Sequence, residues 1–353
     1  MRGAPLAAAF HREVVAPLLR RTWGDVPFVA GRFGAGSDVL EYDDDVSTDH
    51  DWGLRCTLLV DRDADRDADR DADRDGPAPE EVRDLLEREL PPVFTTAAGS
   101  HPVRFATTWD PRVRHRVEVA DLDGFVRSRL GVGPRDGFTV ADWLSFTGQA
   151  VLELTAGPVF ADPAGRWDRL RRALAWYPDD VWRHVVACAW KQLEQELPFV
   201  GRTGARGDDL GSRLVAARLA RTATHLGLLL DRVWAPYAKW TGTAFAASPA
   251  GRAGPHLHRA LAADRWPERE AALCAALEDL LLRQREVGLP APGPATGPFH
   301  GRPFRGVTEG LAEAVAAGLR GFPPLGVGAA DQWTGAVDVL VRPGLRRSLV
   351  GAS

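Results

Sequence analysis

Two amino-acid types are missing from this chain. Among its 353 residues there is no isoleucine and no asparagine, and lysine occurs only at Lys191 and Lys239. Such a bias is typical of a strongly GC-rich bacterial genome. Where arginine has replaced lysine almost everywhere, a retained lysine indicates a site that needs a compact ammonium group. Chance survival of two lysines is the equal alternative.

Long apolar segments are also missing. No run approaches the roughly 20 apolar residues that a membrane-spanning helix needs. The opening segment, MRGAPLAAAFHREVVAPLLRR, is interrupted by His11, Arg12 and Glu13. This pattern predicts an amphipathic helix and argues against a secretory signal peptide.

Cysteine is scarce, and the charge is nearly balanced. The three cysteines are far apart, without CxxC spacing, which argues against a disulfide framework or a zinc site and predicts a reducing, cytoplasmic setting. The formal net charge is -4. This charge predicts no broad surface for binding polyanions, so nucleic acid is an unlikely partner. A local basic cleft is the alternative.

The residues that are present predict an α+β protein. A small α/β domain with a mixed sheet is expected over residues 1–130, and a larger all-helical domain over 131–353. Hydrophobic periodicity predicts strands in the first domain and helices in both. The expected strands are 26–31, 54–60 and two more in PVRFATT and RHRVEVADL; the expected helices are 4–22, 79–90, 141–155, 166–176, 179–197, 208–233, 256–264, 267–287 and 307–319. The segment WTGAVDVLV predicts a short β-like tail. The four-residue repeat DRDADRDADRDADRDG, at 61–76, has nothing to bury and predicts a solvated, disordered loop.

The stretch GAGSDVLEYDDDVSTDHDWG, residues 34–53, carries the clearest chemical pattern. Gly36 and Ser37 are followed, after eleven residues, by Asp49-His50-Asp51. A Gly-Ser turn allows backbone N–H groups to approach a triphosphate closely. On a strand, Asp49 and Asp51 project to the same face, where the two carboxylates repel each other unless a cation lies between them.

Hard oxygen ligands of this kind predict Mg²⁺, which also binds substrate phosphates. Two such ions about 4 Å apart activate an attacking hydroxyl and stabilise the leaving group. A third carboxylate is expected on a neighbouring strand. Glu118 is the first choice, with Asp121 and Asp123 as alternatives. An ordinary solvated acidic surface is the competing interpretation of Asp49 and Asp51.

This spacing resembles that of the polymerase-beta-like nucleotidyltransferase superfamily. More specifically, five segments together resemble a bacterial family catalogued as domain of unknown function 4037: GAGSDVLEYDDDVSTDHDWG, DWLSFTGQAVLELTAGPVFAD, YPDDVWRHVVACAWKQLEQELPFVGRTGARGDDLGSRLVAARLAR, APYAKWTGTAF and GAADQWTGAVDVL. They recur in order over nearly the whole chain. The resemblance implies a nucleotidyltransferase fold with a helical C-terminal domain, and it implies no established substrate.

Two further segments offer groups for phosphate or acceptor binding. GRTGARGDDLGSR predicts a glycine-rich loop in which Arg202 and Arg206 precede a helix capped by Asp208 or Asp209 and bearing Arg213. A flexible connector is the alternative.

WAPYAKWTGTAF contributes Tyr237 and Lys239. Tyr237 would stack on a nucleobase or an acceptor ring, and Lys239 would neutralise phosphate charge. A packed interhelical loop is the alternative. Lys191 has an ordinary partner at Glu194, one helical turn away.

The pattern as a whole predicts a Mg²⁺-dependent enzyme that transfers an NMP from an NTP to the hydroxyl of a small-molecule acceptor. Asp49, Asp51 and Glu118 hold metal, with Glu118 also a candidate general base, and Gly36 and Ser37 hold the triphosphate. Arg202, Arg206, Arg213, Tyr237 and Lys239 contact the nucleotide or acceptor. The alternatives are a nucleotide-binding regulatory protein without catalysis, and a nucleotidyltransferase that modifies a protein.

Overall fold

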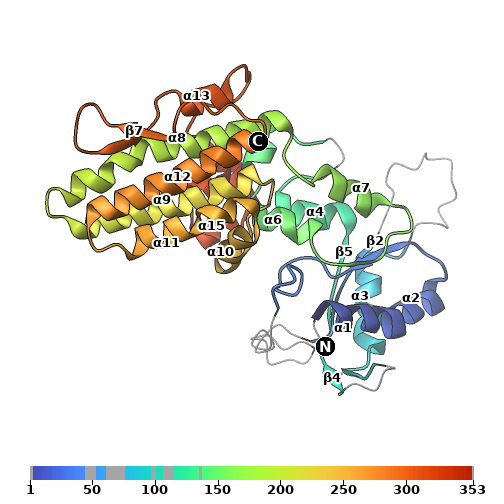
Figure 1. The fold of residues 1–353 in the computed structure, drawn as a ribbon. Coiled ribbons are helices and arrows are strands. Elements are labelled where there is room, and N and C mark those ends of the chain that lie inside the picture. Colours follow the sequence, from blue (N-terminus) through green and yellow to red (C-terminus); the bar gives the residue numbers. More distant parts are fainter. Residues whose placement is uncertain are drawn as a thin grey trace. The chain divides into compact units, whose positions relative to one another are not determined.

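The computed structural model describes residues 3–43, 53–60, 76–96, 101–105, 114–134 and 137–351. Its contacts divide the chain into two units, shown in Figure 1. Unit 1 contains residues 1–137 and 150–175, and unit 2 contains 138–149 and 176–353. The segment 150–175 lies beyond the predicted boundary at residue 130 but groups with the first unit, because β6 (Val159–Ala161) pairs with β1 (Phe28–Gly31).

Unit 1 is built on a mixed four-stranded sheet with the order β5-β2-β1-β6. The central strand β2 (Arg55–Val60) runs antiparallel to β1 and parallel to β5 (Arg116–Asp121). β2 is buried on both faces except at its first residue, which suits its apolar sequence, RCTLLV. The α+β class and the mixed sheet are therefore as predicted.

Helices cover both faces of this sheet. One face carries Cys56, Leu58, Val117 and Val119, and it packs against the N-terminal helices and α3. Against the other face lies α4, which contacts both β2 and β5. The unit's helices are α1 (Gly3–Phe10), η1 (His11–Val15), α2 (Ala16–Trp23), α3 (Pro79–Glu89), α4 (Leu122–Leu130) and α7 (Arg166–Ala173), with the greater part of α6 (Gly148–Thr155); β3 (Val93–Phe94) and β4 (Val103–Arg104) form a separate pair.

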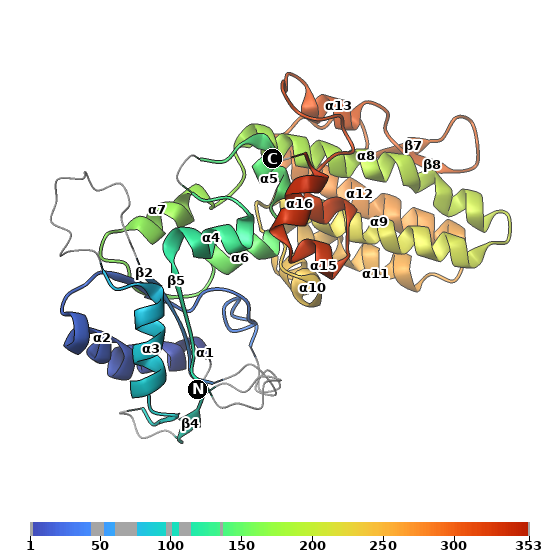
Figure 2. The ribbon, with the colours of Figure 1, turned by 180° about the vertical axis from the view of Figure 1, so that it is seen from behind.

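Unit 2 is mainly helical. Its long helices α8 (Asp179–Gly204), α9 (Asp209–Leu230) and α12 (Trp266–Glu286) lie side by side in both views (Figures 1 and 2). The buried indole of Trp190 on α8 donates to Gln284 Oε1 on α12, 2.6 Å away. The remaining elements are α5 (Val140–Ser145), α10 (Ala238–Ala247), η4 (Pro249–Ala253), α11 (Gly254–Ala262), β7 (Thr296–Pro298), β8 (Arg305–Val307), α13 (Leu311–Ala316), α14 (Ala330–Trp333), α15 (Val337–Leu340) and α16 (Pro343–Leu349).

Three local predictions in this region were wrong. The tail expected to be β-like, residues 333–341, is helical at α15, because alternation over a few residues does not distinguish a strand from a helix whose backbone groups bond locally. Residues 234–242, which lie between the helices expected over 208–233 and 256–264, contain the start of α10. The helix expected over 141–155 is broken at Phe146, which has extended backbone angles and ends α5.

Within the described residues, no helix is both long and apolar enough to cross a membrane. The predicted 61–76 loop falls outside the described residues apart from Gly76.

His11 gives unit 1 a predicted acid sensitivity. Burial lowers the pKa of His11 from 6.5 to about 4, and the ring lies 5.4 Å from that of Phe160. Between pH 6.5 and 4 the unfolded chain therefore binds more protons at this residue than the folded chain. We expect this contribution to stability to be complete above pH 6.5 and to be lost, by about 1–3 kcal/mol, as the pH falls to 4.

Urea unfolding at pH 7 and at pH 4.5 tests this expectation. His11→Gln should show a smaller loss of unfolding free energy between the two pH values than wild type. His258→Gln, at an exposed position on α11, is the control. An equal loss in wild type and His11→Gln would contradict the prediction.

Candidate functional site

The turn that follows β1 is held by a buried arginine. Arg32 is only 2% exposed, and its guanidinium makes two hydrogen bonds to the carboxylate of Asp38, from Nε at 2.7 Å and from Nη2 at 2.9 Å. It also donates to the backbone oxygens of Phe33 (2.6 Å) and Ala35 (3.0 Å). A bidentate pair of this kind fixes geometry as well as charge. Arg32 therefore fixes the shape of the loop that contains the Gly-Ser pair.

Two glycines are required inside this loop. Gly34 has φ +83° and Gly36 has φ +147°, conformations that side chains disfavour. A Cβ on Gly36 would lie 2.2 Å from Asp38 Oδ1 and 2.6 Å from Arg32 Nη2. Ser37 follows directly, half-buried, at the start of the turn that leads away. The predicted Gly-Ser turn is thus present and closely packed against the Arg32–Asp38 pair.

Glu118 lies on β5 and points away from the apolar core. Its neighbours Val117 and Val119 belong to that core, whereas the Glu118 side chain is 44% exposed. In the parallel register, Glu118 is opposite Thr57 of β2. Thr57 also contacts the backbone of Phe33. Phe33 precedes the turn that contains Gly34, Gly36 and Ser37, which we call the glycine turn. The β-sheet therefore places Glu118 on the face from which that turn leaves.

The glycine turn and Glu118 come together at Gly34. A Cβ built on Gly34 would lie 3.6 Å from Glu118 Oε2 and 3.3 Å from Arg129 Nη2. The Gly34 amide donates to the backbone oxygen of Glu153 at 2.8 Å. Two motifs that are more than 80 positions apart in the sequence are therefore neighbours in unit 1.

The two alternative third carboxylates have other roles. Asp121 caps α4 by accepting a hydrogen bond from the Gly124 amide at 2.6 Å. Asp123 lies 3.6 Å from a guanidinium nitrogen of Arg166. Of the three, Glu118 is the carboxylate beside the glycine turn.

Asp49 and Asp51 lie outside the described residues. Among the side chains that the structure does describe, there is no group of three or more His, Cys, Asp or Glu residues arranged to hold a metal ion. Glu118 itself fits a cation, because its carboxylate is half-exposed and already binds a positive charge, that of Arg129, at 2.8 Å. Carboxylate oxygen is also the donor that Mg²⁺ prefers.

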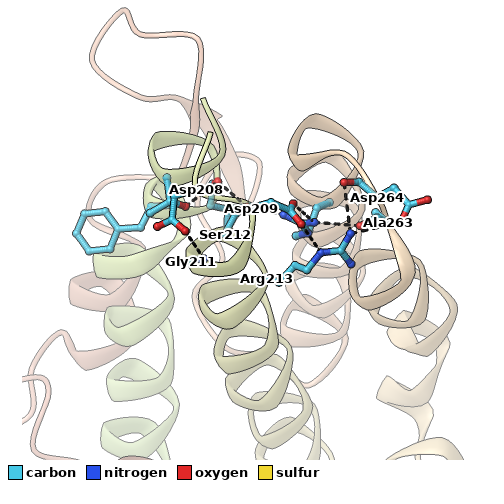
Figure 3. Close-up of polar contacts among 11 residues, drawn as sticks. Asp208, Asp209, Gly211, Ser212, Arg213, Ala263 and Asp264 are labelled. Atoms are coloured by element: carbon cyan, nitrogen blue, oxygen red, sulfur yellow. Dashed lines mark hydrogen bonds and ion pairs between the residues drawn. The ribbon is translucent and has the colours of Figure 1, made fainter. Parts of the chain in front are cut away.

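The other predicted binding residues belong to unit 2, and Arg213 is the most constrained of them. Its guanidinium contacts Asp209 at 2.6 Å and Asp264 at 3.3 Å, as Figure 3 shows. Asp209 also accepts from the buried Arg269 at 2.9 Å. Asp208 caps α9 through the Gly211 amide, as predicted. In this structure Arg213 therefore belongs to a network that fixes the first turn of α9.

The predicted glycine-rich loop is largely a helix, and this expectation was wrong. α8 continues through Gly204, so Gly201, Arg202 and Gly204 are helical. A Cβ on Gly204 would lie 2.4 Å from the Cβ and Cγ atoms of Trp266. Residues three apart share a helix face, so a Cβ on Gly201 would also approach this tryptophan, at 3.0 Å, and would lie still nearer to Phe304, at 2.5 Å. These glycines allow α8 to approach the start of α12.

Gly204→Ala tests this interpretation. The new methyl group would overlap the part of Trp266 nearest the backbone, which cannot move freely, so we expect destabilisation by about 1–3 kcal/mol in urea unfolding. Gly242→Ala is the matched control, since Gly242 is also helical and a Cβ there would have no neighbour within 4 Å. The control should be neutral or more stable by up to about 1 kcal/mol. Equal effects at the two positions would contradict the packing role of Gly204.

The remaining predicted residues of unit 2 are at its surface. Arg202 lies over the ring of Phe199 at 5.3 Å, and Arg206 is exposed after the end of α8. Lys239 is exposed, with Nζ 4.9 Å from the ring of Trp240. Tyr237 Oη accepts from Trp240 Nε1 at 2.8 Å.

Lys191 makes its predicted pair with Glu194 at 2.9 Å, and a second pair with Glu313 at the same distance. Both carboxylates raise the pKa of Lys191 by hydrogen bonding. This lysine is therefore accounted for by ordinary surface pairing.

Three residues of the site were missed by sequence reasoning: Arg32, Arg129 and Glu153. The position of Arg32, between an apolar strand and a glycine turn and six residues before Asp38, is a local signal that could have identified it. Arg129 and Glu153 carry no comparable signal, because they meet only through the packing of α4 and α6.

Comparison with known proteins gives a family match, no curated relative and a similar solved structure. Residues 143–241 match a family described as a domain of unknown function, DUF4037, so the predicted resemblance to that family is confirmed over this segment. No curated protein matches the chain. A nucleotidyltransferase-like protein from Exiguobacterium sibiricum 255-15 is similar at 12% identity and a TM-score of 0.33, with 79% of this chain and 77% of that chain covered.

Proposed function

We propose that this chain is a Mg²⁺-dependent nucleotidyltransferase that moves an NMP from an NTP to the hydroxyl group of a small molecule. The observation that carries the proposal is the meeting of the glycine turn with Glu118 at Gly34. A turn suited to phosphate thereby lies next to a carboxylate suited to a cation, and Mg²⁺ binds both kinds of group.

The proposed reaction assigns a role to each motif. The acceptor oxygen bonds to the α-phosphorus, the bond from the α-phosphorus to its bridging oxygen breaks, and pyrophosphate leaves with the electron pair. The acceptor's proton passes to Glu118. Asp49, Asp51 and Glu118 would hold the metal, and Gly36 and Ser37 the β- and γ-phosphates. When bound, Mg²⁺ supplies charge neutralisation for the attacking and leaving oxygens.

The acceptor is proposed to be a small molecule. A net charge of -4 gives no general attraction for a polynucleotide. The proposal retains five residues of unit 2 as contacts for acceptor or nucleotide: Arg202, Arg206, Arg213, Tyr237 and Lys239.

Thermal denaturation with each of the four NTPs, in the presence and absence of Mg²⁺, tests the nucleotide site. We expect a rise of several degrees in the melting temperature of wild type with one or more NTPs, only when Mg²⁺ is present. Asp49→Ala/Asp51→Ala should show no such rise. A rise that is independent of Mg²⁺, or no rise with any NTP, would overturn the proposed site.

A nucleotide-binding regulatory protein of the same fold is the second candidate. It is favoured by the Glu118–Arg129 pair, because Glu118 is already neutralised by an arginine in this structure. A protein acceptor is a further variant of the first proposal. Release of pyrophosphate separates these possibilities: the regulatory protein binds NTP without releasing it, and a protein-modifying enzyme releases it only with a protein acceptor.

A further inference from the structure

Arg129 lies beside the glycine turn at Gly34, where an added Cβ would be 3.3 Å from its Nη2 atom. Its Nη2 atom donates to Glu118 Oε1 at 2.8 Å, and its Nε atom lies 3.5 Å from Glu153 Oε2. Its guanidinium carbon lies 3.8 Å from the centre of the Phe125 ring. The side chain is 18% exposed. Arg129 is thus held by groups on β5, α4 and α6.

We propose that Arg129 is a positioning residue that holds Glu118 before metal arrives and then binds the triphosphate at the glycine turn. This inference rests on the proposed function. Two anchors of Arg129, Glu153 and Phe125, do not depend on Glu118. The guanidinium therefore keeps its place beside Gly34 when Glu118 turns to a metal ion.

Charge and shape support both parts of this role. Glu118, Glu153 and Arg129 together carry one negative charge, whereas the two carboxylates without the arginine would carry two. Arg129 thus lowers the attraction of the site for a bare divalent cation. The planar guanidinium of Arg129 matches the oxygens of a phosphate group. Arg129 therefore favours binding of a divalent cation only when the cation is bound together with a triphosphate.

Two binding measurements on the full chain test the proposal without any assay of turnover. The first titrates Mn²⁺ alone and follows free Mn²⁺ by electron paramagnetic resonance. The second measures, by calorimetry at saturating Mg²⁺, the binding of the α,β-methylene analogues of the four NTPs. The variants are Arg129→Gln and Arg129→Lys. Arg127→Gln is the matched control, since it removes an equal charge from an exposed position on the same helix.

Arg129→Gln is expected to shift the two affinities in opposite directions. Mn²⁺ should bind about tenfold more tightly, because a neighbouring positive charge is gone. The NTP analogue should bind about tenfold or more weakly, because a charged hydrogen-bond donor is gone. Arg129→Lys should retain the wild-type affinity for Mn²⁺ and only part of that for the analogue. Arg127→Gln should change neither by more than about twofold.

If Arg129 had a merely structural role, Arg129→Gln would weaken the affinities for Mn²⁺ and for the NTP analogue together, or would change neither. Either of these results overturns the proposal. If wild type binds neither Mn²⁺ nor any analogue, the proposed function itself fails, and the role of Arg129 fails with it. If wild type binds both and Arg129→Gln resembles Arg127→Gln, the proposed function stands and only the role of Arg129 is rejected.

Discussion

Glu118→Gln is expected to slow pyrophosphate release by about a hundredfold or more while leaving the protein folded. Glutamine has nearly the same shape but lacks the charge that would hold a cation and accept a proton, and losses of this size follow the removal of one such group. Stability should change little, because Glu118 is 44% exposed and its pair with Arg129 is largely at the surface.

The measurement is pyrophosphate release from each NTP with Mg²⁺ and a panel of hydroxyl-bearing acceptors, beside a melting curve for each protein. Glu89→Gln is the control, since Glu89 is an exposed carboxylate at the end of α3 in the same unit. Turnover that is equal in Glu118→Gln and wild type would exclude Glu118 from the reaction. A large drop in melting temperature would instead show that Glu118 is needed for folding.

Arg32→Met is expected to give the largest loss of stability, about 3–5 kcal/mol of unfolding free energy. Methionine leaves the carboxylate of Asp38, which is 16% exposed, without its bidentate partner. Two backbone oxygens of the turn lose a donor as well. Removing one member of a buried ion pair costs this much because the other charge stays buried.

Urea unfolding of Arg32→Met, Asp38→Leu and the double variant measures the coupling. The double variant should lose clearly less stability than the sum of the two single losses, because it leaves no uncompensated charge. The pair Arg83–Glu80, with side chains 48% and 69% exposed, is the control. Arg83→Met should cost less than about 1 kcal/mol. A similar small cost for Arg32→Met would show that the turn does not depend on this arginine.

The sequence predicted the elements whose signal is local. The apolar sequence RCTLLV identified β2, alternation identified β5, and apolar periodicity identified helices such as α3, α9 and α12. The cap of α9 at Asp208 and the pair of Lys191 with Glu194 were also predictable, because both contacts span three residues. In each case the partners are near neighbours along the chain, so spacing and residue type are sufficient.

Predictions were least successful where the local signal was ambiguous. Gly201 and Gly204 were expected to open a loop, since glycine disfavours a helix by about 1 kcal/mol relative to alanine. Residues more than 60 positions later explain them: Trp266 occupies the space that a Cβ on Gly204 would need, and Phe304, with Trp266, the space that a Cβ on Gly201 would need. The contact between two helices outweighed the local preference of the residues.

The candidate site shows the same division. The sequence by itself determined the α+β class, the Gly-Ser turn and the choice of Glu118 as a strand carboxylate facing away from the core. Only the tertiary structure decided that Glu118 meets the turn at Gly34, that Arg32 holds the turn, and that Arg129 neutralises Glu118. The physical reason is that the strength of an electrostatic interaction depends on the distance between the charged side chains, and the placement of β5, α4 and α6 in the fold sets those distances.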